Sequence, residues 1–291
     1  MAANPLADPR ALRDVLSRHG VWLTKAMGQH LLVDGAVLER IVDAASLTPQ
    51  TQVLEVGPGA GVLTLALSRR AARVVAVEVD RRMVGVLQET VPAGNVEVVQ
   101  ADALQIDAGA LFAGHPFTLV ANLPYGVATP LLRTLLYNPP RGRPQEMVVM
   151  VQREVAYRLA ARPGHAGILS VAALLMADVE LLFDVPRTAF FPPPDVMSTV
   201  VRLRPLAGPR VPLLPSEHRF FQTVEAGFRQ RRKQLHNALG TLGVGTERIE
   251  VGLASAGVDP ARRAETLSLS EWSRLSASLW DPAEAVESDA E

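Results

Sequence analysis

Short apolar runs alternate with longer helical patterns along the first two thirds of this chain. Runs rich in Val, Leu and Ala predict five strands, at residues 52–56, 73–79, 96–100, 117–121 and 147–151. Apolar positions that recur every three or four residues predict helices at residues 34–45, 81–90, 129–137 and 152–161, and another that ends at residue 70. This alternation favours an α/β fold in which a parallel sheet carries helices on both faces.

The pattern changes after residue 205. Residues 204–218 are rich in Pro and polar residues, which is typical of a linker. Apolar positions then predict one helix over 220–239, and glycine-broken helical patterns continue to residue 280. We expect a sheet domain at 1–205, with 1–24 as an N-terminal extension, a small, mostly helical domain at 206–280 and an acidic flexible tail at 281–291.

Composition indicates a folded chain and excludes several kinds of site. Hydrophobic residues make up 48% of the 291 positions and charged residues 20%, which is enough for a sizeable core. Cysteine is absent, and the six histidines show no metal-binding spacing, so we expect no metal. There is no signal peptide, no apolar run of membrane-spanning length and no coiled-coil seam. We therefore expect a cytoplasmic monomer.

The net charge of −1 hides an uneven distribution of charge. Five acidic residues and no basic residue lie in the last eleven positions, so the remaining 280 residues carry +4. Residues 218–233 contain five basic residues against Glu225 alone, a local charge of +4. Such a basic segment is typical of contact with nucleic acid phosphates.

A glycine-rich turn and two acidic residues mark the ends of the first three predicted strands. Residues 57–61 (GPGAG) follow the first strand, and glycines let the backbone pass close to a ligand. Glu78 lies 21 residues after Gly57, where a carboxylate binds ribose hydroxyls. Asp102 ends the third strand, where it is placed to accept from an adenine amine. These strand ends meet at one edge of an open sheet and predict a nucleoside site.

Two nucleoside cofactors compete for this pattern. A nicotinamide dinucleotide needs a third glycine at position 62, which is Val here, and loop N–H groups for its pyrophosphate. Pro58 removes one of those N–H groups. S-adenosylmethionine carries no phosphate and tolerates the proline, so the pattern favours this methyl donor.

Residues 122–125 (NLPY) follow the fourth predicted strand and combine an amide, a proline and an aromatic ring. The Asn122 side-chain oxygen accepts from an amine, and Pro124 constrains the turn so that nearby carbonyls point inward. Tyr125 offers a face on which a flat ring stacks. Together they predict chemistry on the exocyclic amine of a nucleobase.

Eight segments, taken in order, resemble one family over nearly the whole chain. They are KAMGQHLL (25–32), LEVGPGAGVLT (54–64), VEVD (77–80), ADAL (101–104), NLPYG (122–126), FFPPPDVMSTVVRL (190–203), FRQRRKQLHNAL (228–239) and RAETLS (263–268). The sequence resembles the KsgA-type ribosomal RNA adenine dimethyltransferases, which modify two adjacent adenines near the 3′ end of small-subunit rRNA. The resemblance implies a Rossmann-like methyltransferase sheet, S-adenosylmethionine as donor, and 16S rRNA within the 30S subunit or its precursor as partner.

The resemblance also implies donor contacts at six positions, namely His30, Leu32, Gly57, Glu78, Asp102 and Asn122. Three neighbouring positions depart from the common pattern of the family. His30 stands where many relatives have Asn, Leu31 where they have Phe, and Gly126 where Asn is commoner.

For the acceptor, the residues predict that the target amine is held without being deprotonated. The Asn122 oxygen and the carbonyl of Leu123 or Pro124 hold its two hydrogens, and the resemblance favours Pro124. Tyr125 stacks on the base. We expect the RNA itself to contact two aromatic residues and a basic helix, at Phe190, Phe191, Arg229, Arg231, Arg232 and Lys233.

Two other functions fit parts of the pattern. An antibiotic-resistance methyltransferase acting on 23S rRNA shares NLPY but typically lacks the FRQRRK and RAE segments present here. A non-catalytic ribosome assembly factor needs no donor site, and the intact set of strand-end residues argues against it.

Overall fold

The computed structural model describes residues 4–23, 30–137, 142–161, 163–230 and 232–280, and the chain forms two compact units. The first unit comprises Met1–Tyr157 and Asp178–Pro205, and the second comprises Arg158–Ala177 and Leu206–Glu291. The sequence placed one boundary at residue 205. The structure divides the chain there and also assigns residues 158–177 to the second unit. The predicted tail at 281–291 lies outside the described residues.

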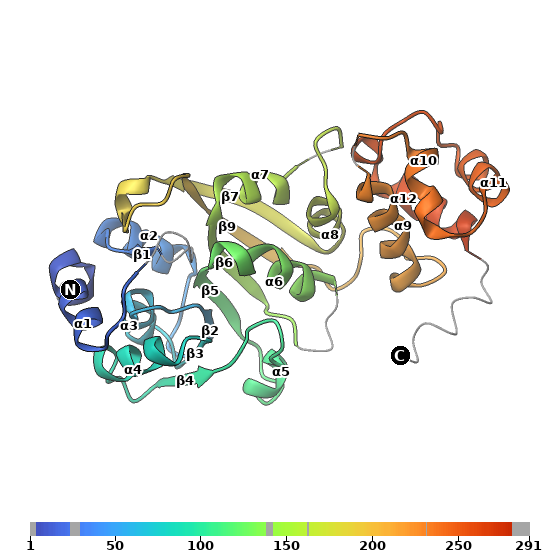
Figure 1. The fold of residues 1–291 in the computed structure, drawn as a ribbon. Helices are drawn as coiled ribbons and strands as arrows, with labels where there is room; N and C mark the ends of the chain where they lie inside the picture. The colour runs from blue at the N-terminus through green and yellow to red at the C-terminus, as the bar shows by residue number, and fades with distance from the viewer. Residues whose placement is uncertain (1–3, 24–29, 138–141, 162, 231, 281–291) are drawn as a thin grey trace. The chain divides into compact units, whose positions relative to one another are not determined.

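A seven-stranded mixed sheet forms the centre of the first unit (Figure 1). Its strand order is β4 (Val96–Gln100), β3 (Arg73–Glu78), β2 (Gln52–Val56), β5 (Thr118–Asn122), β6 (Glu146–Gln152), β9 (Ser198–Pro205) and β7 (Ala177–Val185). The strands from β4 to β6 are the five predicted ones and pair in parallel. β9 runs antiparallel to β6, so the sheet is not wholly parallel.

The order of strands reverses at one place in this sheet. The chain passes from β2 to β3 to β4 in one direction and then returns to place β5 on the other side of β2. The turns that follow β2 and β5 therefore leave in opposite directions and open a crevice between them. The glycine-rich turn and NLPY are these two turns.

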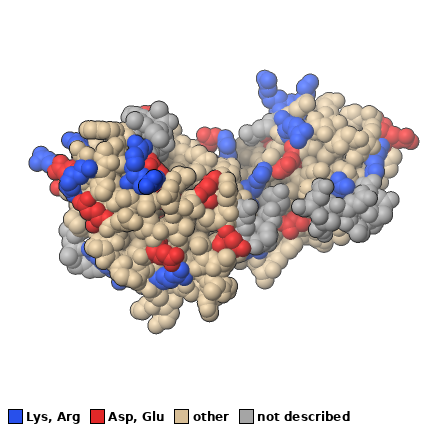
Figure 2. All heavy atoms as spheres, turned by 60° about the horizontal axis from the view of Figure 1, so that its bottom comes forward, with Lys and Arg blue, Asp and Glu red and all other residues tan. Residues whose placement is uncertain are grey.

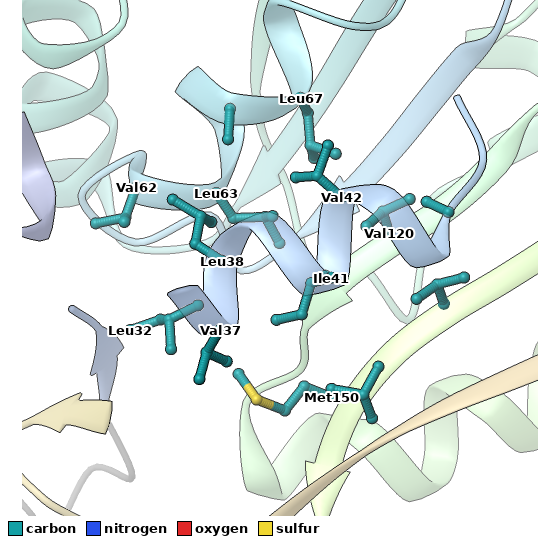
Figure 3. Packing of buried hydrophobic residues seen from close by; sticks show 14 of the residues in the cluster. Leu32, Val37, Leu38, Ile41, Val42, Val62, Leu63, Leu67, Val120 and Met150 are labelled. Carbon is teal, nitrogen blue, oxygen red and sulfur yellow. The ribbon is translucent and has the colours of Figure 1, made fainter. Parts of the chain in front are cut away.

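Helices cover both faces of the sheet, as the alternation of apolar runs predicted. On one face, Leu38 and Ile41 of α2 (Gly35–Ala44) pack with Leu63 of α3 (Val62–Ser68) and with Val120 and Met150 of the sheet (Figure 3). The residues that point the other way are also buried, as at positions 54, 75, 119 and 149. On that side, α6 (Tyr125–Tyr137) contacts β6. Helix α4 (Arg81–Thr90) contacts β3 and β4 and lies on the same face as α3, because the right-handed connections through α3 and α4 advance in the same direction along the sheet.

The remaining elements of the first unit lie around this sheet. The helices are α1 (Pro9–Arg18), α2 (Gly35–Ala44), α3 (Val62–Ser68), α4 (Arg81–Thr90), α5 (Ala108–Leu111), α6 (Tyr125–Tyr137) and α7 (Arg153–Leu159), whose last two residues belong to the second unit. A separate two-stranded ladder joins β1 (Leu31–Leu32) to β8 (Phe190–Phe191). Helix α6 begins earlier than predicted, so Tyr125 lies in its first turn.

The second unit is helical, as the sequence predicted. It contains α8 (Ile168–Met176), α9 (Glu217–Arg229), α10 (Leu235–Leu239), α11 (Thr246–Ala256) and α12 (Leu269–Leu279). Trp272 of α12 is fully buried, and Gly227 of α9 packs so closely on it that an added Cβ would lie 2.5 Å from the indole ring. This contact fixes α9 against α12.

The predicted helix over 220–239 is interrupted. Helix α9 ends at Arg229, and Gln230 leaves the helical conformation with φ −123° and ψ 67°. Helix α10 starts again at Leu235, where the backbone N–H donates to the Arg262 carbonyl at 2.7 Å. The basic residues Arg232 and Lys233 therefore lie in a turn and not on a helix face.

Candidate active site

A cavity of about 340 Å³ opens at the carboxyl ends of β2, β3 and β5, where the strand order reverses. This volume is within the range of small-molecule sites. Its wall comes from four segments that are far apart in the sequence: residues 30–32, 55–63, 78–83 and 122–127. Phe190 adds to the wall from β8.

The glycine-rich turn touches the NLPY turn directly. Gly57 has φ +68°, and a Cβ added to it would lie 2.7 Å from the Pro124 Cγ. Gly59 has φ +57°, and a Cβ there would lie 2.5 Å from the Leu31 side chain. Both positions require a left-handed backbone and leave no room for a side chain, so the glycines are needed for conformation and for contact.

Glu78 ends β3 and lines the cavity with its carboxylate held by backbone N–H groups. Oε1 accepts from the N–H groups of Val79 at 2.9 Å and Asp80 at 3.0 Å, and Oε2 accepts from Gly59 at 3.4 Å. Burial raises the pKa of this group, while the three backbone hydrogen bonds oppose that rise because they favour the charged form. The carboxylate is therefore fixed in orientation between two turns.

Glu55 is a second carboxyl group in the cavity wall, and sequence reasoning did not single it out. It lies on β2 with 1% of its surface exposed. Burial raises its pKa to about 8; the Thr64 hydroxyl opposes this shift, and the charge of Glu78 adds to it. The signal in the sequence was an acidic residue inside an otherwise apolar strand, which is costly unless the residue has a role.

Asn122 is the last residue of β5 and is oriented by the segment across the cavity. Its Nδ2 donates to the His30 carbonyl oxygen at 3.2 Å. With the nitrogen turned toward that carbonyl, the side-chain oxygen is the atom of Asn122 that remains free to accept from a ligand.

The two backbone carbonyls that follow Asn122 differ in their hydrogen bonds. The Pro124 carbonyl accepts from the N–H groups of Val127 at 2.9 Å and Ala128 at 3.0 Å, at the start of α6. Leu123 donates its own N–H to the Met150 carbonyl of β6 at 3.1 Å, which fixes the plane of the turn. The Pro124 carbonyl, which the family resemblance favoured as an acceptor for the target amine, is therefore already occupied by two N–H groups of α6.

Tyr125 is half-buried, with its ring at the cavity wall. Its hydroxyl lies 3.3 Å from the Ser198 Oγ on β9, and its ring centroid lies 5.6 Å from that of His30. Burial raises the pKa of the phenol, so it stays neutral at physiological pH. The ring is therefore held at both ends beside Asn122.

His30 is fixed by the proline run that follows β8. Its Nδ1 lies 2.8 Å from the Pro192 carbonyl, which can only accept, so Nδ1 carries a hydrogen. The neighbouring Leu32 pairs with Phe190 across the two-stranded ladder and is 3% exposed. This ladder contributes Leu31, Leu32 and Phe190 to the cavity wall.

Comparison with known proteins identifies the family. A model described as "Ribosomal RNA adenine dimethylase" matches residues 23–281. The chain belongs to this family. Membership confirms the predicted enzyme class, a methyltransferase of the ribosomal RNA adenine dimethylase type, and the predicted relationship.

Curated relatives of the dimethylase family cover almost the whole chain. A protein named "Ribosomal RNA small subunit methyltransferase A" from Pelotomaculum thermopropionicum is 45% identical over 292 residues, with 95% of this chain and 98% of the relative covered. A protein of the same name from Geobacillus thermodenitrificans is 42% identical over 288 residues and covers 94% and 97%.

Solved structures show the same fold. The crystal structure of the 23S rRNA methyltransferase ErmE has a TM-score of 0.61 and 28% identity, covering 86% of this chain and 99% of that one. A dimethyladenosine transferase from Plasmodium falciparum has a TM-score of 0.66 at 24% identity, with 84% and 96% covered. These neighbours confirm the Rossmann-like methyltransferase sheet.

The structure does not bring every predicted residue of this dimethylase to the cavity. Asp102 is exposed and accepts from the Leu104 N–H at 2.9 Å, so it caps its own turn and is not part of the wall. Phe190 lines the cavity, whereas Phe191 packs under the Arg13 guanidinium, 5.0 Å from its ring centroid.

The predicted basic RNA-binding residues belong to the second unit, whereas Phe190 and Phe191 belong to the first. Arg229, Arg232 and Lys233 are all exposed at the end of α9 and in the following turn, and Arg231 lies outside the described residues. Figure 2 shows Lys and Arg side chains projecting from the surface of this unit. Within the described residues, no helix is long and apolar enough to cross a membrane. The same residues contain no cluster of His, Cys, Asp and Glu suited to a metal.

Proposed function

We propose that this protein transfers methyl groups from S-adenosylmethionine to the N6 amines of two adjacent adenines in 16S rRNA. The observation that carries the proposal is the orientation of Asn122. Its nitrogen donates to the His30 carbonyl, so its oxygen is presented beside a nucleoside-sized cavity whose wall holds Glu78. The names of the curated relatives, at 42–45% identity, support the small subunit as the source of the RNA.

The cavity fits the methyl donor in size and chemistry. Glu78 is held at a strand end where its carboxylate accepts from two ribose hydroxyls, and Gly57 and Gly59 bring the backbone close to the ligand. Leu32 and His30 close the other side, with the His30 Nε2 free to contact the donor. When bound there, S-adenosylmethionine supplies an electrophilic methyl group on a positive sulfonium.

Asn122 and its neighbour hold the acceptor amine. The lone pair of an adenine amine is delocalised into the ring, so the amine attacks well only when both hydrogens are held out of the plane. The Asn122 oxygen accepts one hydrogen. Two N–H groups already occupy the Pro124 carbonyl, so we assign the second hydrogen to the Leu123 carbonyl. The rate gain then comes from alignment, without a general base.

Tyr125 holds the plane of the base. Aromatic stacking contributes about 1–3 kcal/mol per base, which offsets part of the cost of unstacking the adenine from its neighbours. Its contacts with Ser198 and His30 keep the ring in place before the RNA arrives. Phe190, buried at the cavity wall, supplies a second aromatic surface near the sulfonium.

The second unit contributes RNA binding in this proposal. Arg229, Arg232 and Lys233 present positive charge to phosphates, and the partner is 16S rRNA within the 30S subunit or its precursor. A single chain supplies every residue of the proposed donor site, so the proposed function needs no second copy, and we propose a monomer.

Transfer of tritiated methyl groups tests this function directly. Naked 16S rRNA, partly assembled 30S subunits and 23S rRNA are each incubated with the protein and labelled S-adenosylmethionine. We expect label in adenines of the small-subunit substrates. Label in 23S rRNA alone would favour the antibiotic-resistance class, and donor binding without label in any RNA would favour a non-catalytic assembly factor.

The variant Asn122→Ala tests the mechanism in the same assay. It should lower kcat/KM by about 10²–10³-fold, the usual effect of losing one oriented polar contact in a transition state, with donor affinity largely unchanged. Asn237→Ala, an exposed position in α10, is the matched control and should keep full activity. Full activity in the Asn122 variant would contradict the mechanism.

A further inference from the structure

The buried carboxyl of Glu55 has no role in holding the acceptor base, yet it lines the cavity. Only 1% of this residue is exposed, and its Oε2 has no hydrogen-bond partner among the described residues. A buried carboxylate oxygen without a partner is strongly disfavoured. The site therefore needs either a proton on this group or a positive charge beside it.

The rest of the cavity wall favours a cationic occupant. Glu78 on β3 is the charged group beside Glu55, and the Thr64 hydroxyl on α3 faces it. No Lys or Arg is present among the described residues that line the cavity. The other titratable groups of the wall are His30, Asp80 and Tyr125.

The two glutamates differ in how their charge is supported. Three backbone N–H groups hold the carboxylate of Glu78, which stabilises its charged form. Glu55 has no such set of donors, so its charge depends on what enters the cavity. Burial raises the pKa of both acids, but only Glu78 has backbone donors that oppose the rise, so the protonation of Glu55 is the more sensitive to what occupies the cavity.

We propose that Glu55 is a proton-linked counter-ion for the methyl donor: it is a neutral carboxylic acid when the cavity is empty and ionises when a sulfonium ligand binds. The inference rests on the proposed function, because that function supplies the cation. On binding, the O–H bond of the Glu55 acid breaks, its electron pair stays on the carboxylate and the proton passes to solvent. Methyl transfer removes the sulfonium charge, so Glu55 takes a proton back and the product is held less tightly than the donor.

The direction of the pH effect follows from the state of the empty site. Burial, opposed by Thr64 and reinforced by Glu78, raises the pKa of Glu55 to about 8, so the acid is mostly protonated at pH 7. A positive charge nearby lowers that pKa. Donor affinity must then rise with pH by up to about tenfold per unit below pH 8 and level off above it.

Calorimetry measures the proton directly. S-adenosylmethionine and S-adenosylhomocysteine are each titrated into the full chain at pH 7, in two buffers with different enthalpies of ionisation. The wild type should release about one proton per donor bound, and fewer with the product, which lacks the sulfonium. Glu55→Gln should release almost none and should bind the donor with an affinity that no longer rises with pH.

Glu78→Gln is the matched control and should still release the proton at saturating donor. The assignment would be overturned if the Glu78 variant stopped releasing the proton while the Glu55 variant still released it. It would also be overturned if the wild type bound the donor without releasing a proton. If Glu55→Gln does not fold, Thr64→Val replaces it: removing the hydroxyl should move the levelling of donor affinity to higher pH, and an unmoved profile would refute the proposal. If the wild type bound no donor at all, the proposed function itself would be contradicted.

Discussion

At the scale of single residues, hydrogen bonds that are already made decide what the cavity offers a ligand. Asn122 donates to the His30 carbonyl, and His30 in turn donates to the Pro192 carbonyl. The Pro124 carbonyl accepts two N–H groups of α6. What remains for a ligand is the Asn122 oxygen, the His30 Nε2 and the Leu123 carbonyl. The proposed acceptor contacts follow from this elimination.

Two glycines in the cavity wall should respond in opposite ways to a single added methyl group. Gly57→Ala places a Cβ 2.7 Å from Pro124 at φ +68° and should destabilise the protein by about 1–3 kcal/mol and weaken donor binding. Gly126→Ala meets nothing within 4 Å in the first turn of α6, so it should stabilise the protein by about 0.5–1 kcal/mol. Urea unfolding and donor titration check both variants, and equal effects would contradict the contact between the two turns.

At the scale of elements, the break between α9 and α10 changes how the basic segment can meet RNA. In a continuous helix, residues 229 and 233 would lie on one face. In the structure, Gln230 leaves the helix, and Arg232 and Lys233 extend from an exposed turn. A turn lets both side chains reach phosphates that a straight helix face would not align.

Reversing a charge in this turn should weaken RNA binding and reduce its dependence on salt. Lys233→Glu should lower affinity for 16S rRNA and reduce the slope of log affinity against log salt by about one, because one phosphate contact is lost. Arg10→Glu, on an exposed face of α1, is the control. The measurement is filter binding over a range of salt concentrations, and an unchanged slope for Lys233→Glu would remove the turn from the RNA interface.

The elements were predictable where their signal was local. Four of the five parallel strands, β2, β3, β5 and β6, are mostly buried because helices cover both faces of the sheet, so each stands out as a continuous apolar run. The edge strand β4 is only partly buried and was predicted from its valines. β7 is different, since most of its residues are partly or fully exposed, and it carries no such run. β9 is mostly buried but was not predicted as a strand. It pairs antiparallel with β6, and almost fifty residues separate the two strands along the chain, so no neighbouring residues indicate this pairing.

At the scale of the whole molecule, a single buried acid should make stability depend on pH. The pKa of Glu55 is raised from 4.5 to about 8 on folding, so the folded chain binds this proton more tightly than the unfolded chain. The free energy of unfolding therefore falls as pH rises between about 4.5 and 8, by up to about 1.4 kcal/mol per pH unit from this group.

The variant Glu55→Gln removes this dependence in the absence of any ligand. Gln mimics the protonated acid at every pH, so the variant keeps the stability that the wild type loses as pH rises. The free energy of unfolding of the variant minus that of the wild type should therefore be larger at pH 8 than at pH 6. Thermal unfolding of both proteins at the two pH values checks the difference. A difference that stays constant with pH would show that Glu55 is ionised in the folded state.

The sequence by itself determined the strand ends and the chemistry attached to them. A left-handed turn needs glycine, a buried strand needs apolar residues, and an amide, a proline and an aromatic ring in a row predict a bound amine. These patterns selected Gly57, Glu78 and Asn122, which line one cavity, and their contacts with the donor stay a prediction. These signals are local, because each depends on a few neighbouring residues.

Only the tertiary structure decided which groups remain available. It placed Gly57 against Pro124, turned Asn122 toward His30, left Glu55 without a partner on Oε2 among the described residues and kept Asp102 outside the wall. Asp102 is held by the N–H of Leu104, two residues away, whereas the contacts of Gly57 and Asn122 join segments that are more than sixty residues apart in the chain. The free energy of a buried polar group depends on such contacts, and no local pattern records them.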